Sequence, residues 1–293
     1  MLIATVIAAE TLKKGELSSA ADMLKEADCE ITEIGAIQNA KAADIFFHGD
    51  VASANGAMTP LRQSHDIGIV PAENRRKKLL ISDMDSTMIT VECIDELADY
   101  AGIKDQISEI TERAMQGELD FEEALRGRIA LLKGLDRSAI QQCLDERVEI
   151  MPGAQTLVKT MDSLGADTIL VSGGFSSFAE PVAKKIGFSR SESNILGIEA
   201  GLLTGLLDGP IVDSMRKAEL LKQSITSAGL VTADCLAVGD GANDIPMIEL
   251  AGLGVAYHAK PKAAAAANVA INHNDLSALL YLQGIPSNQW VDN

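Results

Sequence analysis

The spacing of apolar residues changes twice along the chain, and each change marks the start of a new predicted unit. Over residues 1–75, short apolar runs alternate with amphipathic stretches. Such runs predict strands, and apolar residues at helical spacing predict helices. Strands are expected at 2–8, 31–37, 45–48 and 67–70, and helices at 16–27 and 52–65. This βαββαβ order is that of a ferredoxin-like unit, so we expect an α+β accessory domain over residues 1–75.

Helical spacing dominates the next part of the chain, from about residue 92 to about residue 150. Amphipathic segments are separated there by glycines at 102, 117 and 134, which favour helix ends. Helices are expected at 92–101, 105–116, 120–132 and 138–147. They follow a short apolar strand at 79–82. Because they are inserted directly after this strand, we expect them to form a cap over its carboxyl end.

From residue 151 the chain alternates helices with short apolar strands. Helices are expected at 152–164, 177–186, 215–226, 244–250 and 276–282, strands at 168–171, 235–238, 253–255 and 269–271, and a glycine-rich hairpin at 197–210. Strands that alternate with helices predict a parallel sheet. We therefore expect an α/β fold, a doubly wound Rossmann-like parallel sheet over residues 76–293 with a helical cap insertion.

Composition narrows the possible partners. The formal net charge of −17 argues against nucleic acid, whose phosphates require a basic patch. The four cysteines include no Cys-x-x-Cys pair, which argues against zinc or a disulfide framework and is typical of reduced thiols. No window approaches the roughly 18 apolar residues of a membrane span, and the N-terminus lacks the features of a secretion signal. We expect a cytoplasmic protein, monomeric or homodimeric, with a small-molecule substrate.

Two carboxylates follow the strand at 79–82 directly. Asp83 and Asp85 are spaced at i and i+2. In an open α/β sheet, ligands lie beyond the carboxyl ends of the strands, and a strand tip holds a carboxylate rigidly enough to attack a phosphorus atom in line. Taken alone, however, Asp-x-Asp is equally well explained as a solvated turn.

Three later stretches add candidate chemistry. Ser172 and Gly173 offer a hydroxyl and exposed backbone N–H groups, which suit a phosphate, although a plain turn would also explain them. Lys217 alone is better explained as a solvated helix lysine. The stretch 239–244, Gly-Asp-Gly-Ala-Asn-Asp, follows a strand directly. Its oxygen ligands suit Mg²⁺ and are hard to explain by packing.

In this order, Asp-x-Asp-x-Thr, Ser-Gly, a later Lys and Gly-Asp-Gly-x-Asn-Asp resemble the motifs of the haloacid dehalogenase superfamily of phosphatases. The resemblance runs from about residue 79 to about residue 282. It implies that Asp83 is a nucleophile that forms an aspartyl phosphate, and that Asp85 acts first as acid and then as base. It also implies that Mg²⁺ is held by Asp83, the backbone carbonyl of Asp85 and Asp240.

The same resemblance assigns supporting roles to five more residues. Ser172, the Gly173 N–H and Lys217 would hold the phosphoryl oxygens. Asn243 would orient Lys217 or the substrate, and Asp244 would support the metal site from outside its ligands.

The insertion resembles the cap of phosphoserine phosphatases, through Glu92 and the stretches 117–121 and 126–134. In that family a glutamate and an arginine hold the amino-acid end, and the matching residues are Glu92 and Arg128. Glu92 could pair with an ammonium, and Arg128 could grip a carboxylate with two hydrogen bonds. Without the resemblance, Glu92 is better explained as an acidic residue in the first turn of a helix. Arg128 is then better explained as a partner in a surface salt bridge. Arg126 competes with Arg128 for the role.

Further expectations rest on the same likeness. Phe121 and Met115 would close the pocket, although either could belong to the cap core. The implied activity is hydrolysis of phosphoserine at the last step of serine synthesis. A related phosphate such as phosphorylated homoserine, or a serine-sensing protein with a vestigial phosphatase core, remain alternatives. The N-terminal unit resembles a diverged amino-acid-binding domain of the ACT type.

Overall fold

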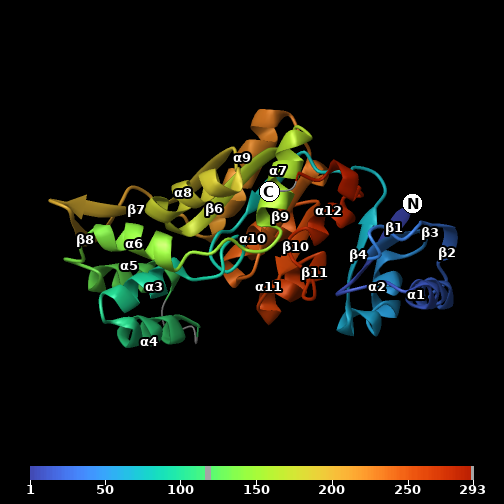
Figure 1. Cartoon of the computed structure of the whole chain (residues 1–293), viewed down its shortest axis with the longest axis horizontal. Coiled ribbons are helices and arrows are strands. Elements are labelled where there is room, and N and C mark those ends of the chain that lie inside the picture. Colours follow the sequence, from blue (N-terminus) through green and yellow to red (C-terminus); the bar gives the residue numbers. More distant parts are fainter. Residues whose placement is uncertain (116–119, 292–293) are drawn as a thin grey trace.

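The fold comprises two β-sheets with flanking helices and a helical cap (Figure 1). The computed structural model describes residues 1–115 and 120–291. Figure 1 shows the N-terminal sheet at one end, the larger sheet in the middle, and the cap at the other end. Within the described ranges, no helix combines the length and apolar character needed to cross a membrane.

The N-terminal sheet has the order β2-β3-β1-β4, and all its pairings are antiparallel. Its elements are β1 (Leu2–Ala8), α1 (Lys14–Glu26), β2 (Glu30–Ile34), β3 (Ala42–His48), α2 (Val51–Ala57) and β4 (His65–Pro71). The predicted βαββαβ order is confirmed, and a third strand separates the two strands of each βαβ unit, as in a ferredoxin-like fold.

The helix predicted at 52–65 is wrong in its second half. Helix α2 ends at Ala57, and Leu61–Gln63 form a separate 3-10 turn. Pro60 lies between them, and a proline cannot continue an α-helix because it lacks the N–H and crowds the preceding turn.

The N-terminal sheet is buried on both faces. Along β1, Ala4 and Val6 pack with α1 and α2, whereas Ile3 and Ile7 belong to the main hydrophobic core. Side chains that alternate between the two faces in this way are expected for a strand, whose period is two residues. On β4, a Cβ at Gly68 would collide with the Leu282 side chain, so a side-chain-free residue is required where the two units touch. The sheet therefore docks directly against the core.

Arg75 joins the two units at this contact. Its guanidinium donates two hydrogen bonds to the Asp44 carboxylate, at 2.8 and 2.6 Å, and one to Thr5 Oγ1. It also donates to the backbone carbonyls of Tyr281 and Leu282. Arg75 and Asp44 are 12% and 11% exposed, so the pair is held with little competition from water.

We expect Arg75→Ala to lower the free energy of unfolding by about 3 kcal/mol, because it leaves the Asp44 carboxylate buried without its cation. Urea unfolding measures this change. The matched control is Arg76→Ala, since Arg76 is exposed and its loss should cost less than about 0.5 kcal/mol. Equal effects of the two substitutions would contradict the prediction.

The larger sheet has the order β11-β10-β9-β5-β6-β7-β8 and is parallel except for the β7–β8 hairpin. Its strands are β5 (Leu79–Ser82), β6 (Asp167–Phe175), β7 (Arg190–Glu199), β8 (Leu202–Asp208), β9 (Cys235–Gly239), β10 (Leu253–Tyr257) and β11 (Val269–Ile271). The helices after the cap are α7 (Ala154–Ser163), α8 (Ser176–Ile186), α9 (Ser214–Ala228), α10 (Ile245–Leu250), α11 (Pro261–Ala266) and α12 (Ala278–Leu282).

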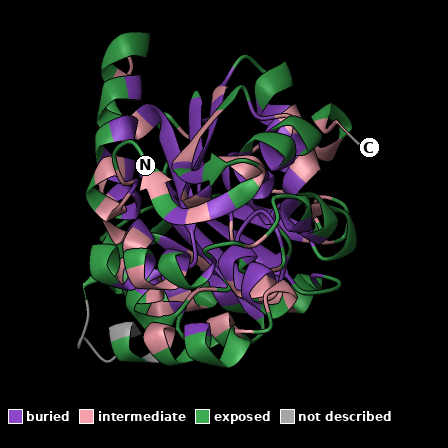
Figure 2. Cartoon of the chain, turned by 90° about the vertical axis from the view of Figure 1, so that its left-hand side faces the viewer, coloured by how far each residue is buried: buried purple, intermediate pink, exposed green. Residues whose placement is uncertain are grey.

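Helices cover both faces of this sheet, as predicted for a doubly wound fold. On β5, Leu80 packs in the cluster that contains α7 and α8 side chains, whereas Leu79 and Ile81 pack with side chains of α9 and α10. Figure 2 shows buried residues along the strands and exposed residues on the outer helices. Some details differ from the prediction. Helix α11 is additional, and β7 begins seven residues before the predicted hairpin because it first pairs in parallel with β6. Strand β6 continues past the predicted end at residue 171 to Phe175, so Ser172 and Gly173 lie within a strand and the alternative of a plain turn is wrong.

The cap consists of α3 (Cys93–Tyr100), α4 (Lys104–Met115), α5 (Phe121–Leu131) and α6 (Ser138–Glu146), which confirms the predicted helical insertion. Two backbone hydrogen bonds close its base, from Thr90 N–H to the Glu149 carbonyl and from Met151 N–H to the Met88 carbonyl. The cap also pairs with β8, where Leu203 exchanges backbone hydrogen bonds with Gly134 and Leu135. The change from one sheet to the other lies between β4 and β5, and a domain boundary near residue 75 stays a prediction.

Candidate active site

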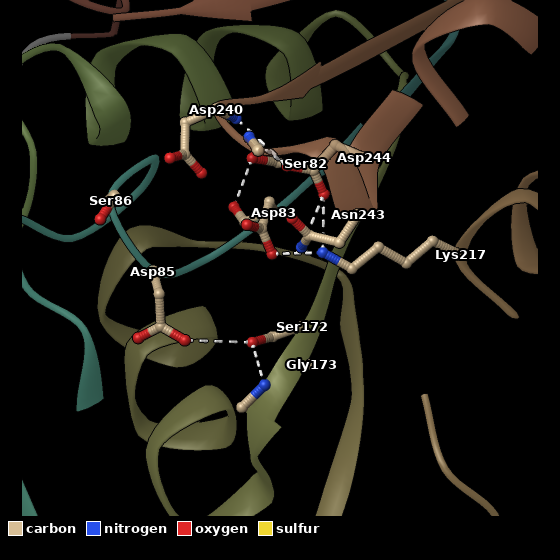
Figure 3. Close-up of polar contacts among 12 residues, drawn as sticks. Ser82, Asp83, Asp85, Ser86, Ser172, Gly173, Lys217, Asp240, Asn243 and Asp244 are labelled. Atoms are coloured by element: carbon tan, nitrogen blue, oxygen red, sulfur yellow. Dashed lines mark hydrogen bonds and ion pairs between the residues drawn. The ribbon is translucent and has the colours of Figure 1, made fainter. Parts of the chain in front are cut away.

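The candidate residues meet at the carboxyl ends of β5, β6 and β9 (Figure 3). Strand β5 pairs in parallel with both β6 and β9, so all three strands end at the same edge of the sheet. The chain leaves β5 toward β6 on one side and reaches β9 on the other side later. Strand order reverses at this point, which is where ligands bind in open α/β sheets.

Lys217 links two of the predicted carboxylates. Its Nζ donates to Asp83 Oδ1 at 2.6 Å and to Asp244 Oδ1 at 2.7 Å (Figure 3). The lysine is 1% exposed, so its explanation as a solvated helix residue is wrong. Burial alone would lower the pKa of Lys217, but the charges of Asp244 and Asp83 outweigh it and raise that pKa. The side chain is therefore a permanent cation at the strand tips.

Asp244 organises the loop after β9. Its Oδ2 accepts hydrogen bonds from the N–H groups of Asp240 and Gly241, at 3.2 and 3.0 Å. Asn243 donates to Asp244 Oδ1 at 3.4 Å and thus connects to Lys217 through Asp244. A Cβ at Gly239 would collide with the Asp244 carboxylate. This loop therefore needs glycine for a close approach, which explains the residue pattern after β9.

Three carboxylates are close enough together to hold a metal ion. One oxygen each of Asp83, Asp240 and Asp244 lies within 4.8 Å of the other two. Burial, and then Asp244, raise the pKa of Asp83 well above its usual range, although Lys217 opposes this. Burial and Asp244 raise the pKa of Asp240 to about 6.

The donor set fits a hard divalent cation. In the described part of the chain, Lys217 is the one cation that pairs with these carboxylates, and it contacts only Asp83 and Asp244. No described group donates a hydrogen bond to the Asp240 carboxylate. Anionic oxygens that are short of positive charge are the ligands that such ions prefer. Asp244 has less capacity as a ligand than Asp83 and Asp240, because both its oxygens already accept hydrogen bonds.

Asp85 connects the sheet to the cap. Its Oδ1 accepts the backbone N–H of Cys93, at the start of α3, at 3.0 Å. Its Oδ2 accepts Ser172 Oγ at 3.4 Å. Burial, and then the charge of Glu92, raise the pKa of Asp85 to about 7. A carboxyl group with this pKa can donate and accept a proton near neutral pH.

The Ser172-Gly173 stretch is held in place from both sides. Ser172 Oγ accepts the N–H of Gly174 at 2.8 Å, and Asn194 donates to the Gly173 carbonyl at 2.7 Å. Asn194, which is 1% exposed, also accepts the Val212 N–H and so ties this stretch to the segment before α9. Sequence reasoning missed Asn194. No local motif marks it, because its partners lie on two other segments.

The cap brings Phe121 against the Ser172-Gly173 stretch. A Cβ at Gly173 would lie 3.3 Å from Cζ of the Phe121 ring, so the ring rests against Gly173. Glu92 is exposed and accepts a hydrogen bond from Ser86 Oγ at 2.6 Å, beside Asp85. The side chain of Met115 lies outside the described residues.

The structure separates the two candidate arginines of the cap. Arg126 is exposed and forms a surface salt bridge with Glu122 at 2.8 Å. A surface salt bridge was the alternative explanation for Arg128, and it applies to Arg126 instead. Arg128 is half-buried. Its Nε donates to the Ala124 carbonyl at 3.3 Å, and no described carboxylate forms a salt bridge with it. This geometry favours Arg128 over Arg126 as a residue for binding an anion.

Comparisons with known proteins agree with this site. The family model of haloacid dehalogenase-like hydrolases matches residues 77–252. The chain is 44% identical over 210 residues to phosphoserine phosphatase of Albidiferax ferrireducens, covering 70% of this chain and 89% of that protein. It is 43% identical over 222 residues to phosphoserine phosphatase of Streptomyces coelicolor, covering 75% of this chain. There, the match spans only 54% of the relative's length.

A solved structure matches almost the whole chain. The probable phosphoserine phosphatase of Vibrio cholerae, in its unliganded form, has a TM-score of 0.78 and 30% identity and covers 98% of this chain and 88% of its own. A substrate-bound phosphoserine phosphatase complex covers 70% of this chain and 98% of its own, with a TM-score of 0.66 and 36% identity. The chain therefore belongs to the haloacid dehalogenase-like hydrolase family, with phosphoserine phosphatases among its relatives.

Proposed function

We propose that this chain is an Mg²⁺-dependent phosphatase that hydrolyses O-phospho-L-serine to L-serine and phosphate, the last step of serine synthesis. The observation that carries the proposal is the arrangement at the tip of β5. There, a buried lysine holds the Asp83 carboxylate, and Asp85, two residues later, has a pKa of about 7. This arrangement supports Asp83 as the nucleophile and Asp85 as the proton donor, and the names of the relatives support phosphoserine as the substrate.

In the first half-reaction, Asp83 attacks the phosphorus atom and forms an aspartyl phosphate. Asp85, protonated near neutral pH, gives its proton to the serine oxygen as that oxygen leaves. Ser172 Oγ, the Gly173 N–H and Lys217 Nζ hold the phosphoryl oxygens. In the second half-reaction, the ionised Asp85 takes a proton from the water that attacks the acyl phosphate.

The metal ion would be held by Asp83, the Asp85 backbone carbonyl and Asp240. When bound, Mg²⁺ would offset the repulsion between the anionic nucleophile and the phosphate dianion. Asp244 and Asn243 support this site by holding the loop after β9 and the lysine.

The amino-acid end of the substrate would lie under the cap. Glu92 is proposed to bind the ammonium and Arg128 the carboxylate, while Phe121 and Met115 close the pocket. The ring of Phe121 already rests against Gly173, which supports a closed position of the cap during the reaction. The N-terminal unit is proposed to be a diverged ACT-type domain. A cytoplasmic location and a monomeric or homodimeric state stay predictions.

The test is phosphate release from L-phosphoserine, with and without Mg²⁺, compared with release from p-nitrophenyl phosphate. Mg²⁺-dependent release with a clear preference for L-phosphoserine would support the proposal. Preference for p-nitrophenyl phosphate would still support phosphatase chemistry, but it would contradict the proposed binding of the amino-acid end by the cap residues. Preference for phosphorylated homoserine would favour the related substrate, and no release from any ester would favour a regulatory protein with a vestigial core.

We expect Mg²⁺ to raise the melting temperature more at pH 8 than at pH 5. Burial raises the pKa values of Asp85 and Asp240 to about 7 and about 6. A carboxyl group with a raised pKa binds its proton more tightly in the folded state, so its stabilising effect is present below pH ~4 and is lost as the pH rises through 6 and 7. Above that range the ionised carboxylates of the site repel one another, and a bound cation relieves this repulsion.

Thermal unfolding at both pH values, with and without Mg²⁺, measures this difference. Asp240→Asn should remove most of the Mg²⁺ effect at pH 8. An equal Mg²⁺ effect at both pH values would contradict the assignment of the raised pKa values to the metal site.

A further inference from the structure

A hollow of about 460 Å³, here called the junction hollow, lies where the N-terminal unit meets the larger sheet. Its walls come from α2, the 3-10 turn after it and β4 on one side, and from the segment α11 to β11 on the other. Strands β4 and β11 lie side by side at this junction (Figure 1), and the Asn272 N–H donates to Asp66 Oδ1 at 2.7 Å. The volume falls in the range of roughly 300–1,000 Å³ that small-molecule sites occupy. The described residues that line it include none of the candidate active-site residues, so the hollow is a separate feature.

Arg62 supplies the charge of the junction hollow. Its Nη1 donates to the Ile67 carbonyl and its Nη2 to Asn55 Oδ1, each at 2.6 Å. Asn55 is itself held, because its Nδ2 donates to the Val51 carbonyl at 3.1 Å. A guanidinium has five N–H donors, so three remain after these two hydrogen bonds. The half-buried guanidinium is therefore fixed in orientation and still has donors to offer a ligand.

The remaining donors of Arg62 face no anion of the chain. Across residues 1–115 and 120–291, no carboxylate forms a salt bridge with Arg62. Burial lowers the pKa of Arg62, and the charge of Asp66 opposes this. Asp66 does not take up the free donors, however, since its Oδ1 accepts the Asn272 N–H and its Oδ2 accepts the side-chain amide of Asn274. A half-buried cation without a paired anion favours the binding of an anion from outside the chain.

The rest of the lining decides what kind of anion fits. Ile69 and Val51 line the hollow from the N-terminal unit, and three alanines within 264–270 line it from the other side. Asn268 is the remaining polar residue of the lining. Its Oδ1 accepts the Gly254 N–H at 2.7 Å, which leaves its amide N–H groups as further donors.

The lining residues that the structure describes include no acidic side chain, although the chain has 42 Asp and Glu residues. An ammonium would therefore meet no opposite charge on this lining, and burying it there would be costly. A carboxylate can bind the guanidinium of Arg62 with two hydrogen bonds, and an aliphatic chain attached to it can pack on the alanines. The lining thus favours a simple carboxylate over an amino acid.

We propose that the junction hollow binds a short aliphatic carboxylate without an amino group, anchored by the guanidinium of Arg62, with its apolar end against residues 264–270. Such a ligand touches the N-terminal unit and the larger sheet at once. It binds only where the two are docked, so it stabilises their contact. The inference goes beyond the proposed function and does not depend on it.

The test measures binding of three probes to the full chain by isothermal titration calorimetry. Butyrate carries the carboxylate and an aliphatic chain, L-2-aminobutyrate adds an ammonium, and butyramide lacks the charge. We expect saturable binding of butyrate and at least about tenfold weaker binding of the other two. Arg128→Ala is measured in parallel, because Arg128 is proposed to bind a carboxylate in the active site, and butyrate binding should persist in this variant.

Two substitutions test the location from opposite walls of the junction hollow. Arg62→Met removes the charge, and Ala264→Leu fills the hollow from α11 while Arg62 stays in place. Each should weaken butyrate binding at least about tenfold. Ala265→Leu is the matched control for the second substitution, since Ala265 is exposed on the same helix and does not line the hollow. It should leave butyrate binding unchanged.

The two variants are needed together, because Arg62→Met also loses the hydrogen bonds to Asn55 and Ile67, whereas Ala264→Leu keeps them. Butyrate binding that survives either substitution, or that Arg128→Ala removes, would place butyrate elsewhere and overturn the proposal. Equal binding of L-2-aminobutyrate and butyrate would overturn the ligand class. Absence of saturable butyrate binding to wild type would reject the site itself. Each of these results is independent of phosphoserine turnover, so the proposed function stands or falls separately.

Discussion

Asp83→Asn is expected to lower kcat for phosphoserine at least about 10⁴-fold, which is the size of loss seen when a catalytic nucleophile is removed. Asparagine has almost the same shape as aspartate but carries no anion to attack phosphorus. The fold should persist, because burial, and then the charge of Asp244, raise the pKa of Asp83 despite Lys217, and because Lys217 keeps Asp244 as a partner. Removing one negative charge from this group relieves repulsion, so the melting temperature should not fall. Loss of activity without loss of stability identifies a chemical role.

The measurement is steady-state phosphate release together with acid quenching of the enzyme mixed with radiolabelled phosphoserine. Wild type should retain label on the denatured chain, since an acyl phosphate survives brief acid treatment, and Asp83→Asn should retain none. Asp162→Asn, at an exposed position of α7, controls for the change of residue type. Metal-dependent turnover by Asp83→Asn near the wild-type rate would mean that water attacks the substrate directly.

Much of the site could be predicted because its residues lie at one type of position. Asp83 and Asp240 each follow a short buried strand, Ser172 lies in the carboxyl-terminal half of β6, and parallel neighbouring strands end at one edge. The alternation of strands and helices predicts that edge, so motifs far apart in sequence are expected to meet there. The structure confirms the meeting through the contacts of Lys217 with Asp83 and Asp244.

The remaining features depend on partners that the local pattern does not show. Lys217 occupies a helix position at which a lysine is ordinarily solvated. Its burial is explained only by its pairing with Asp83 and Asp244, which follow two strands of the larger sheet. Asn194 bonds to Gly173 and to the segment before α9, neither of which is near it in sequence. Side chains with purely long-range partners leave no periodicity to detect.

Lys217→Met is expected to affect stability and activity together. Methionine has nearly the length of lysine but no charge, so Asp83 and Asp244 would face each other in a buried site without a cation. Breaking a buried ion pair in this way costs about 3–5 kcal/mol. Because the lysine also holds a phosphoryl oxygen in the proposed mechanism, kcat should fall about 10²- to 10³-fold. Lys222→Met, at an exposed position of the same helix, should change neither quantity appreciably.

A second substitution separates the two effects of Lys217→Met. Asp244→Asn in the same chain removes one of the unpaired carboxylates, so the double variant should recover part of the lost free energy of unfolding. Activity should not recover, because the cation at the phosphoryl group is still missing. The coupling energy from the four proteins of this cycle, measured by urea unfolding at pH 8, should be well above zero since the two side chains touch. Additive losses of stability would show that the contact at 2.7 Å contributes little, and Lys217 would then act on the substrate alone.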